Sequence, residues 1–260
     1  MTKEICYWAV GDGECAYMLQ TLVDSYHQVG MEDDFHVFSD RMIEGAQTHL
    51  IDSLDTRGFL FKILFLRSQL KQLDYHYFVY FDADTFFVRK PRPILEAINQ
   101  SPIHFFLESP LVDNPKGKNK WWNCPFNDLV QVMRNCGVST KSIYTLNSGC
   151  FVIRADAIDT ACGLAMDFWE YALSKGYQFP DEPAWTYAMH MLCEDPKKHM
   201  LRDYWDIWCS DWEGVFTGRV PDGKEWTFHE YLTGESHQVN PAIVHALRSK
   251  EGLIKRGMHN

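Results

Sequence analysis

Two aspartates follow the most continuous run of bulky apolar residues in the chain. Asp82 and Asp84 stand two residues apart, directly after the run 77–81. In an extended chain, residues two apart point to the same side, and paired carboxylates can hold a divalent cation that in turn neutralises a diphosphate. A solvated turn at the end of a strand is the alternative interpretation. The buried strand favours the metal site, because an unpaired carboxylate beside a core is costly.

A histidine near the C-terminus could complete this site. The short apolar run 241–244 ends in His245, and two cations, Arg248 and Lys250, follow it. A neutral imidazole can add a nitrogen ligand to an oxygen-rich site, and the cations can hold a phosphate. Such a mixed ligand set favours Mn²⁺, with Mg²⁺ as the alternative. One histidine among eleven is a weak signal alone, so its role depends on convergence with Asp84.

A polar triplet precedes the strand predicted over 150–153. It consists of Asn147, Ser148 and Gly149. A glycine at the start of a strand permits close approach of the backbone to a ligand. An ordinary turn explains the same residues, so both interpretations stay open.

Two carboxylates, Asp181 and Glu182, open the helix predicted over 183–192. Helix capping explains them, with Asp181 as the N-cap and both charges favoured by the helix dipole. Catalysis is compatible with capping. A pair of carboxylates at the start of a helix is equally suited to either role.

Strand-like and helix-like patterns alternate along the chain and position these groups. The sequence predicts strands over 5–10, 35–38, 77–81, 104–107 and 150–153. It predicts helices from Cys15 to a stop at Gly30 and over 58–73, 93–99, 128–136, 156–174 and 183–192. Alternation of this kind, without a repeat or linker, indicates a single α/β domain over residues 1–260, with a central, mostly parallel sheet flanked by helices. The last 60 or so residues are poorly periodic, and we expect them to wrap the sheet edge and the site.

Composition excludes several classes of function. The formal net charge of −10 disfavours binding to nucleic acid or to an anionic membrane. The chain has neither an apolar run long enough to span a bilayer nor a secretory signal at its start. Its eight cysteines include no Cys-x-x-Cys pair, and several of them sit in apolar segments, which is typical of buried thiols in a reducing compartment. We therefore expect a cytoplasmic protein.

Taken together, the motifs resemble those of retaining, metal-dependent glycosyltransferases of the GT-A fold. The resemblance is greatest to the group that includes glycogenin and lipopolysaccharide galactosyltransferases, and it extends over most of the chain, from Ile5 to Lys250. It implies a single-domain GT-A (Rossmann-like) fold. Residues 1–105 would form the nucleotide-sugar-binding half, and residues 106–260 the acceptor half with the closing metal-ligand strand.

The resemblance also implies roles for individual residues. Asp82, Asp84 and His245 would bind the metal, and Asp181 and Glu182 would be catalytic. The residues that would contact the donor are Val10, Asp12, Arg57, Lys62, Asp82, Ala83, Asn147, Ser148, Arg248 and Lys250.

The chain departs from the family pattern at two places. The closing His-x-x-Gly-x-x-Lys-Pro motif is one residue shorter here and lacks its glycine, so Arg248 would share the phosphate with Lys250. Glu182 stands where the family pattern has a glutamine. A glutamate at this place is closer to the blood-group-type retaining transferases.

The implied activity is transfer of a sugar from a UDP-linked or other nucleotide-sugar donor to a glycan, lipid or protein hydroxyl, with retention. Segment 109–127 is longer than a loop that merely connects two elements usually is. Its Trp121 and Trp122 would either stack on the acceptor sugar or serve as buried anchors.

Two other functions remain open. Asp82-Ala83-Asp84-Thr85 also matches the first motif of haloacid-dehalogenase phosphatases, although that motif normally lies on the first strand. A sugar-binding or nucleotide-binding module without turnover is the second alternative.

Overall fold

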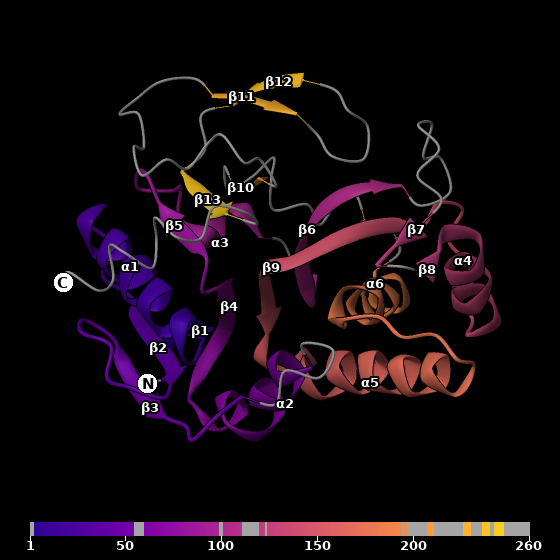
Figure 1. Ribbon diagram of the computed structural model, residues 1–260, viewed down its shortest axis with the longest axis horizontal. Helices are drawn as coiled ribbons and strands as arrows, with labels where there is room; N and C mark the ends of the chain where they lie inside the picture. The colour runs from indigo at the N-terminus through magenta and orange to yellow at the C-terminus, as the bar shows by residue number, and fades with distance from the viewer. Residues whose placement is uncertain are drawn as a thin grey trace.

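The computed structural model describes residues 3–54, 60–98, 101–110, 120–122, 124–193, 195–196, 207–210, 226–229, 236–239 and 242–246. Its main sheet has six strands in the order β3-β2-β1-β4-β9-β6 (Figure 1). In that order they span Gln47–Leu50, Asp34–Ser39, Lys3–Val10, Tyr75–Asp82, Tyr144–Arg154 and Ile103–Pro110. Strand β9 runs antiparallel to both of its neighbours, whereas β1 to β4 pair in parallel. The predicted α/β class with a mostly parallel sheet is confirmed.

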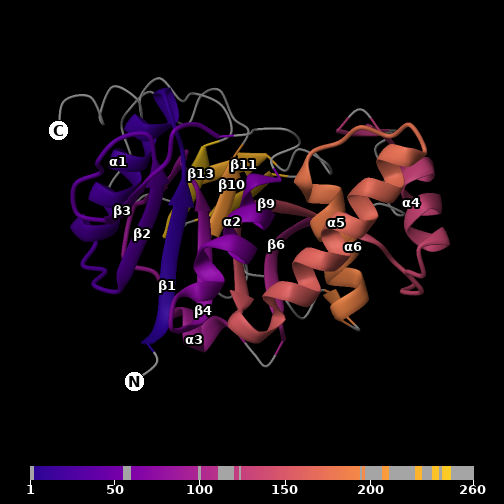
Figure 2. The ribbon, with the colours of Figure 1, turned by 90° about the horizontal axis from the view of Figure 1, so that it is seen from below.

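Helices cover both faces of this sheet (Figures 1 and 2). Helices α2 (Phe61–Ser68), α5 (Ile158–Ser174) and α6 (Asp181–Leu192) share one core cluster with Phe78 and Tyr80 of β4. Helix α1 (Glu14–Gln28) shares the other cluster with Val79 and Phe81. Both faces of β4 are therefore buried, which is why its sequence is apolar without alternation.

A second, three-stranded sheet brings a distant segment back to the end of β4. Strand β5 (Thr85–Phe87) follows β4 after two residues, and β13 (Ile243–Ala246) pairs with it in the antiparallel sense. Strand β10 (Ile207–Ser210) pairs in parallel with β13. Ile243 and Val244 are buried against the α1 side of the main sheet. This apolar packing holds the C-terminal strand in place.

Shorter elements complete the described structure. They are η2 (Leu70–Gln72), α3 (Ile94–Ala97), β7 (Lys120–Trp121), β8 (Cys124–Pro125), α4 (Phe126–Asn135), η3 (Ala155–Ala157), β11 (Trp226–His229) and β12 (Ser236–Val239). No helix in the described part of the chain is both long and apolar enough to cross a membrane.

Three local predictions were wrong. The triplet 147–149 lies inside β9 and not before it, because β6 extends the ladder and pairs Phe106 with Asn147 and Leu107 with Leu146. Asp181 is the first residue of α6 and makes no N-cap hydrogen bond, since Pro180 occupies the cap position. The helix predicted over 58–73 ends at Ser68, where the chain tightens into η2.

Candidate metal centre

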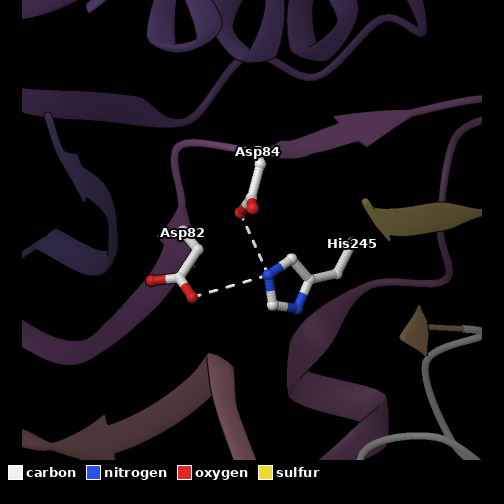
Figure 3. Close-up of side chains that lie close together, drawn as sticks. All are labelled: Asp82, Asp84 and His245. Carbon is white, nitrogen blue, oxygen red and sulfur yellow. Dashed lines mark ion pairs between the residues drawn. The ribbon is translucent and has the colours of Figure 1, made fainter. Parts of the chain in front are cut away.

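Asp82, Asp84 and His245 converge on one point, although His245 is remote in the chain (Figure 3). The Nε2 atom of His245 lies 3.0 Å from Asp84 Oδ1 and 3.5 Å from Asp82 Oδ2. One potential ligand atom from each residue lies within 4.8 Å of the others. The three side chains are thus close enough to share a single ion.

Strand pairing fixes this convergence. Asp82 ends β4, and Asp84 occupies the turn that leads into β5. His245 pairs with Thr85 in the β13–β5 ladder, and the amide of Ala246 donates to the carbonyl of Asp84 over 2.8 Å. The sheet register therefore determines where the imidazole meets the carboxylates.

The site is buried and carries net negative charge. Asp84 and His245 are 5% and 3% exposed, whereas about a quarter (26%) of the Asp82 side chain is accessible. Burial lowers the pKa of His245, but the carboxylates of Asp84 and Asp82 outweigh it and leave that pKa raised. Two carboxylates and one imidazole could together hold a divalent cation.

Gly149 lies against the back of the imidazole. A Cβ atom built on Gly149 would overlap Cε1 and Nδ1 of His245. The sequence predicts a close backbone approach at this glycine, and the group that approaches it in the structure is the His245 ring.

Lys62 lies next to the metal centre on the buried side of α2. Its amine is 3.1 Å from Asp82 Oδ1 and 3.3 Å from Asp181 Oδ2, and it donates to Ser148 Oγ over 2.9 Å. Burial lowers the pKa of Lys62, but Asp181 and Asp82 outweigh it and raise that pKa. The amine is consequently a buried cation that links the metal centre to the start of α6.

Asp181 and Glu182 are both buried at that helix start. Burial raises the pKa of Asp181, an effect that the charge of Lys62 opposes. Oε1 of Glu182 accepts from Asn147 Nδ2 over 3.1 Å and from the Ser148 amide over 3.3 Å. Its Oε2 accepts from Nε1 of Trp122. Donors thus hold both oxygens of the Glu182 carboxylate.

The remaining residues that were predicted to contact the nucleotide-sugar donor lie in several parts of the structure. Val10 pairs with Asp82 across β1 and β4, and Ala83 lies between the two aspartates. Asp12 follows β1, where its carboxylate accepts from the amide of Leu54 over 2.9 Å. Arg57, Arg248 and Lys250 lie outside the described residues.

Two further side chains contact carboxylates of the site: Tyr80, which the sequence-based prediction misses, and Trp122, for which it gives another role. The hydroxyl of Tyr80 donates to Asp82 Oδ1 over 2.5 Å, and Trp122 donates to Glu182. Tyr80 could have been found, because it lies two residues before Asp82 on the same side of an extended strand. Trp122 was predicted to stack on the acceptor sugar or to serve as a buried anchor, and no sequence signal indicates its hydrogen bond to Glu182.

No protein-family model matches the chain, and no curated protein matches it. The geometry and chemistry of the site therefore carry the functional proposal.

Proposed function

We propose that the protein is a metal-dependent glycosyltransferase that moves a sugar from a nucleotide-sugar donor, UDP-linked, to a hydroxyl-bearing acceptor with retention. The observation that carries this proposal is the convergence of Asp82, Asp84 and His245 beside a pair of buried carboxylates. A metal centre next to buried acidic groups suits a reaction in which a diphosphate leaves from an anomeric carbon.

Charge determines how such a site would work. A nucleoside diphosphate leaves as a dianion or more, and Mn²⁺ held by Asp82, Asp84 and His245 would supply the positive charge that stabilises it. Without a cation, Asp82 and Asp84 would repel the phosphates. Lys62 adds one positive charge at the same place, 3.1 Å from Asp82.

The carboxylates at the start of α6 would act on the sugar. We assign to Asp181 a hydrogen bond to a sugar hydroxyl, and to Glu182 a position beside the anomeric carbon. Glu182 accepts from Asn147 and Ser148, and such hydrogen bonds favour the ionised form of a carboxylate. A charged Glu182 could act as a nucleophile or stabilise the positive charge that develops on the sugar ring.

A thermal-shift panel of UDP-, GDP- and CMP-sugars, each with Mn²⁺ or EDTA, tests the proposal. We expect stabilisation by one nucleotide class and only with Mn²⁺, worth about 2.7 kcal/mol at 100 times the dissociation constant. Asp84→Asn should abolish it, whereas Asp156→Asn, which alters an exposed ion pair with Arg154, should not.

Three outcomes would contradict the proposal. Equal stabilisation in EDTA would remove the metal from donor binding. Hydrolysis of a phosphomonoester without any response to nucleotide sugars would favour the phosphatase. Binding with neither sugar transfer nor donor hydrolysis would identify a silent module.

A further inference from the structure

The hairpin formed by β7 and β8 holds its two tryptophans differently. Trp121 pairs with Cys124 and is 7% exposed, whereas Trp122 is 46% exposed. Trp122 also has a φ angle of 50°, the one positive value among the described non-glycine residues. Bulky side chains rarely adopt this left-handed conformation. Trp122 is the residue directly after β7 in the turn that leads to β8, and tight hairpin turns adopt positive φ at this position.

The polar edge of this half-exposed indole reaches a buried group. Nε1 of Trp122 donates to Oε2 of Glu182, a residue that is only 5% exposed. The hairpin turn thus places the Trp122 indole within hydrogen-bond distance of Glu182.

Trp122 and the other donors reach the Glu182 carboxylate from different elements. Asn147 and the amide of Ser148 both donate to Oε1, and both belong to β9. These two bonds hold Oε1. The N–H of Trp122 holds Oε2 from a different element, so it restrains rotation of the carboxylate about Oε1. Trp122 therefore contributes to the direction in which the carboxylate faces.

We propose that Trp122 is a positioning residue that fixes the orientation of the Glu182 carboxylate for reaction with the donor sugar. This inference rests on the proposed glycosyltransferase function. It assigns Trp122 to the site through its N–H group, and it separates Trp122 from the neighbouring Trp121, which packs in the core.

The test compares Trp122→Phe in two backgrounds, wild type and Glu182→Ala. Phenylalanine keeps an aromatic ring and removes the N–H donor. The substrate is the nucleotide sugar that gives the largest thermal shift with Mn²⁺, and the assay measures its hydrolysis to sugar and nucleoside diphosphate, with water as the acceptor. Trp121→Phe is the matched control from the same hairpin.

With Glu182 present, we expect Trp122→Phe to lower kcat about tenfold or more, with KM and the donor-induced thermal shift little changed. In the Glu182→Ala background the same substitution should change kcat by less than about twofold, because the group that it positions is gone. Trp121→Phe should lower kcat by the same factor in both backgrounds, if at all. An unchanged kcat in Trp122→Phe, or an equal loss in both backgrounds, would overturn the inference.

A second measurement separates this inference from the proposed function. If the wild-type protein neither hydrolyses nor transfers from any nucleotide sugar in the panel, the proposed function fails. Urea unfolding of Trp122→Phe, Glu182→Ala and the double variant then decides on the contact itself. A shift of the urea midpoint in the double variant that is smaller than the two single shifts combined supports the coupling, and an additive shift refutes it.

Discussion

The amine of Lys62 lies 3.3 Å from the carboxylate of Asp181, and both side chains are only 3% exposed. A buried ion pair is strongly destabilising when one partner is removed, because the other charge is left without compensation. The family resemblance implies only that Lys62 contacts the donor. The structure shows that Lys62 also neutralises acidic groups of the protein itself.

Lys62→Met, which keeps the length of the side chain, should lower the free energy of unfolding by about 3–5 kcal/mol. Lys71→Met should cost less than ~1 kcal/mol, because its pair with Asp159 is exposed on both sides. Urea unfolding at neutral pH measures both. Equal effects of the two substitutions would show that Lys62 contributes no more than a surface pair.

Gly149→Ala should displace the imidazole of His245, since a Cβ at that position overlaps the ring. Crowding in a packed interior typically costs about 1–3 kcal/mol of unfolding free energy. We also expect the stabilisation by Mn²⁺ to fall, as measured by the difference in melting temperature with Mn²⁺ and EDTA. Gly163→Ala in α5 is the control, because its Cβ meets nothing within 4 Å. A Gly149→Ala protein with the full response to Mn²⁺ would exclude His245 as a ligand.

Glu182→Gln should lower kcat at least ~100-fold, about 2.7 kcal/mol of transition-state stabilisation, with donor binding little changed. A glutamine oxygen can still accept from Asn147 and Ser148, but its amide then meets the N–H of Trp122, donor against donor. Steady-state kinetics and the donor-induced thermal shift separate these effects. Full activity of this variant would reduce Glu182 to an orienting residue.

His36 makes stability dependent on pH. Burial, together with the neighbouring His49, lowers the pKa of His36 to about 4, although Asp34 opposes the shift. Nδ1 of His36 lies 2.9 Å from His49 Nε2, and its Nε2 lies 3.1 Å from the Tyr75 hydroxyl.

An unfolded chain binds a proton at His36 near pH 6.5, whereas the folded protein does so only near pH 4. Stability from this group is therefore complete above about pH 6.5 and is lost as the pH falls toward 4. His36→Gln should reduce the difference in unfolding free energy between pH 7 and pH 5. A midpoint near 6.5 for the His36 C2 proton in an NMR titration would contradict the expectation.

The local pattern of apolar residues was sufficient to predict a helix that buries one stripe of side chains and a strand that is buried on both faces. The run 77–81 predicts β4, which the structure extends to Tyr75–Asp82, and the stripe that begins at Cys15 predicts α1. Both signals arise from apolar burial, which depends on residues close together in the chain.

Features set by distant contacts were not predictable. The register of β6 against β9 includes two irregularities, and it is this pairing that draws Asn147 into a strand. The contact between Trp122 and Glu182 joins a hairpin turn to a helix 60 residues away. Strand β5 has three residues, and it becomes a strand only through pairing with β13.

The pairing of β5 with β13 also sets an order of events during synthesis. About 160 residues separate Asp84 from His245, which at ~5–20 residues per second takes roughly 8–32 s to translate. For that interval the nascent chain carries two of the three candidate ligands and a β5 edge without its partner from β13. An unpaired edge is open to strand addition by another chain. Tight binding of a metal ion would thus report that translation has proceeded through β13.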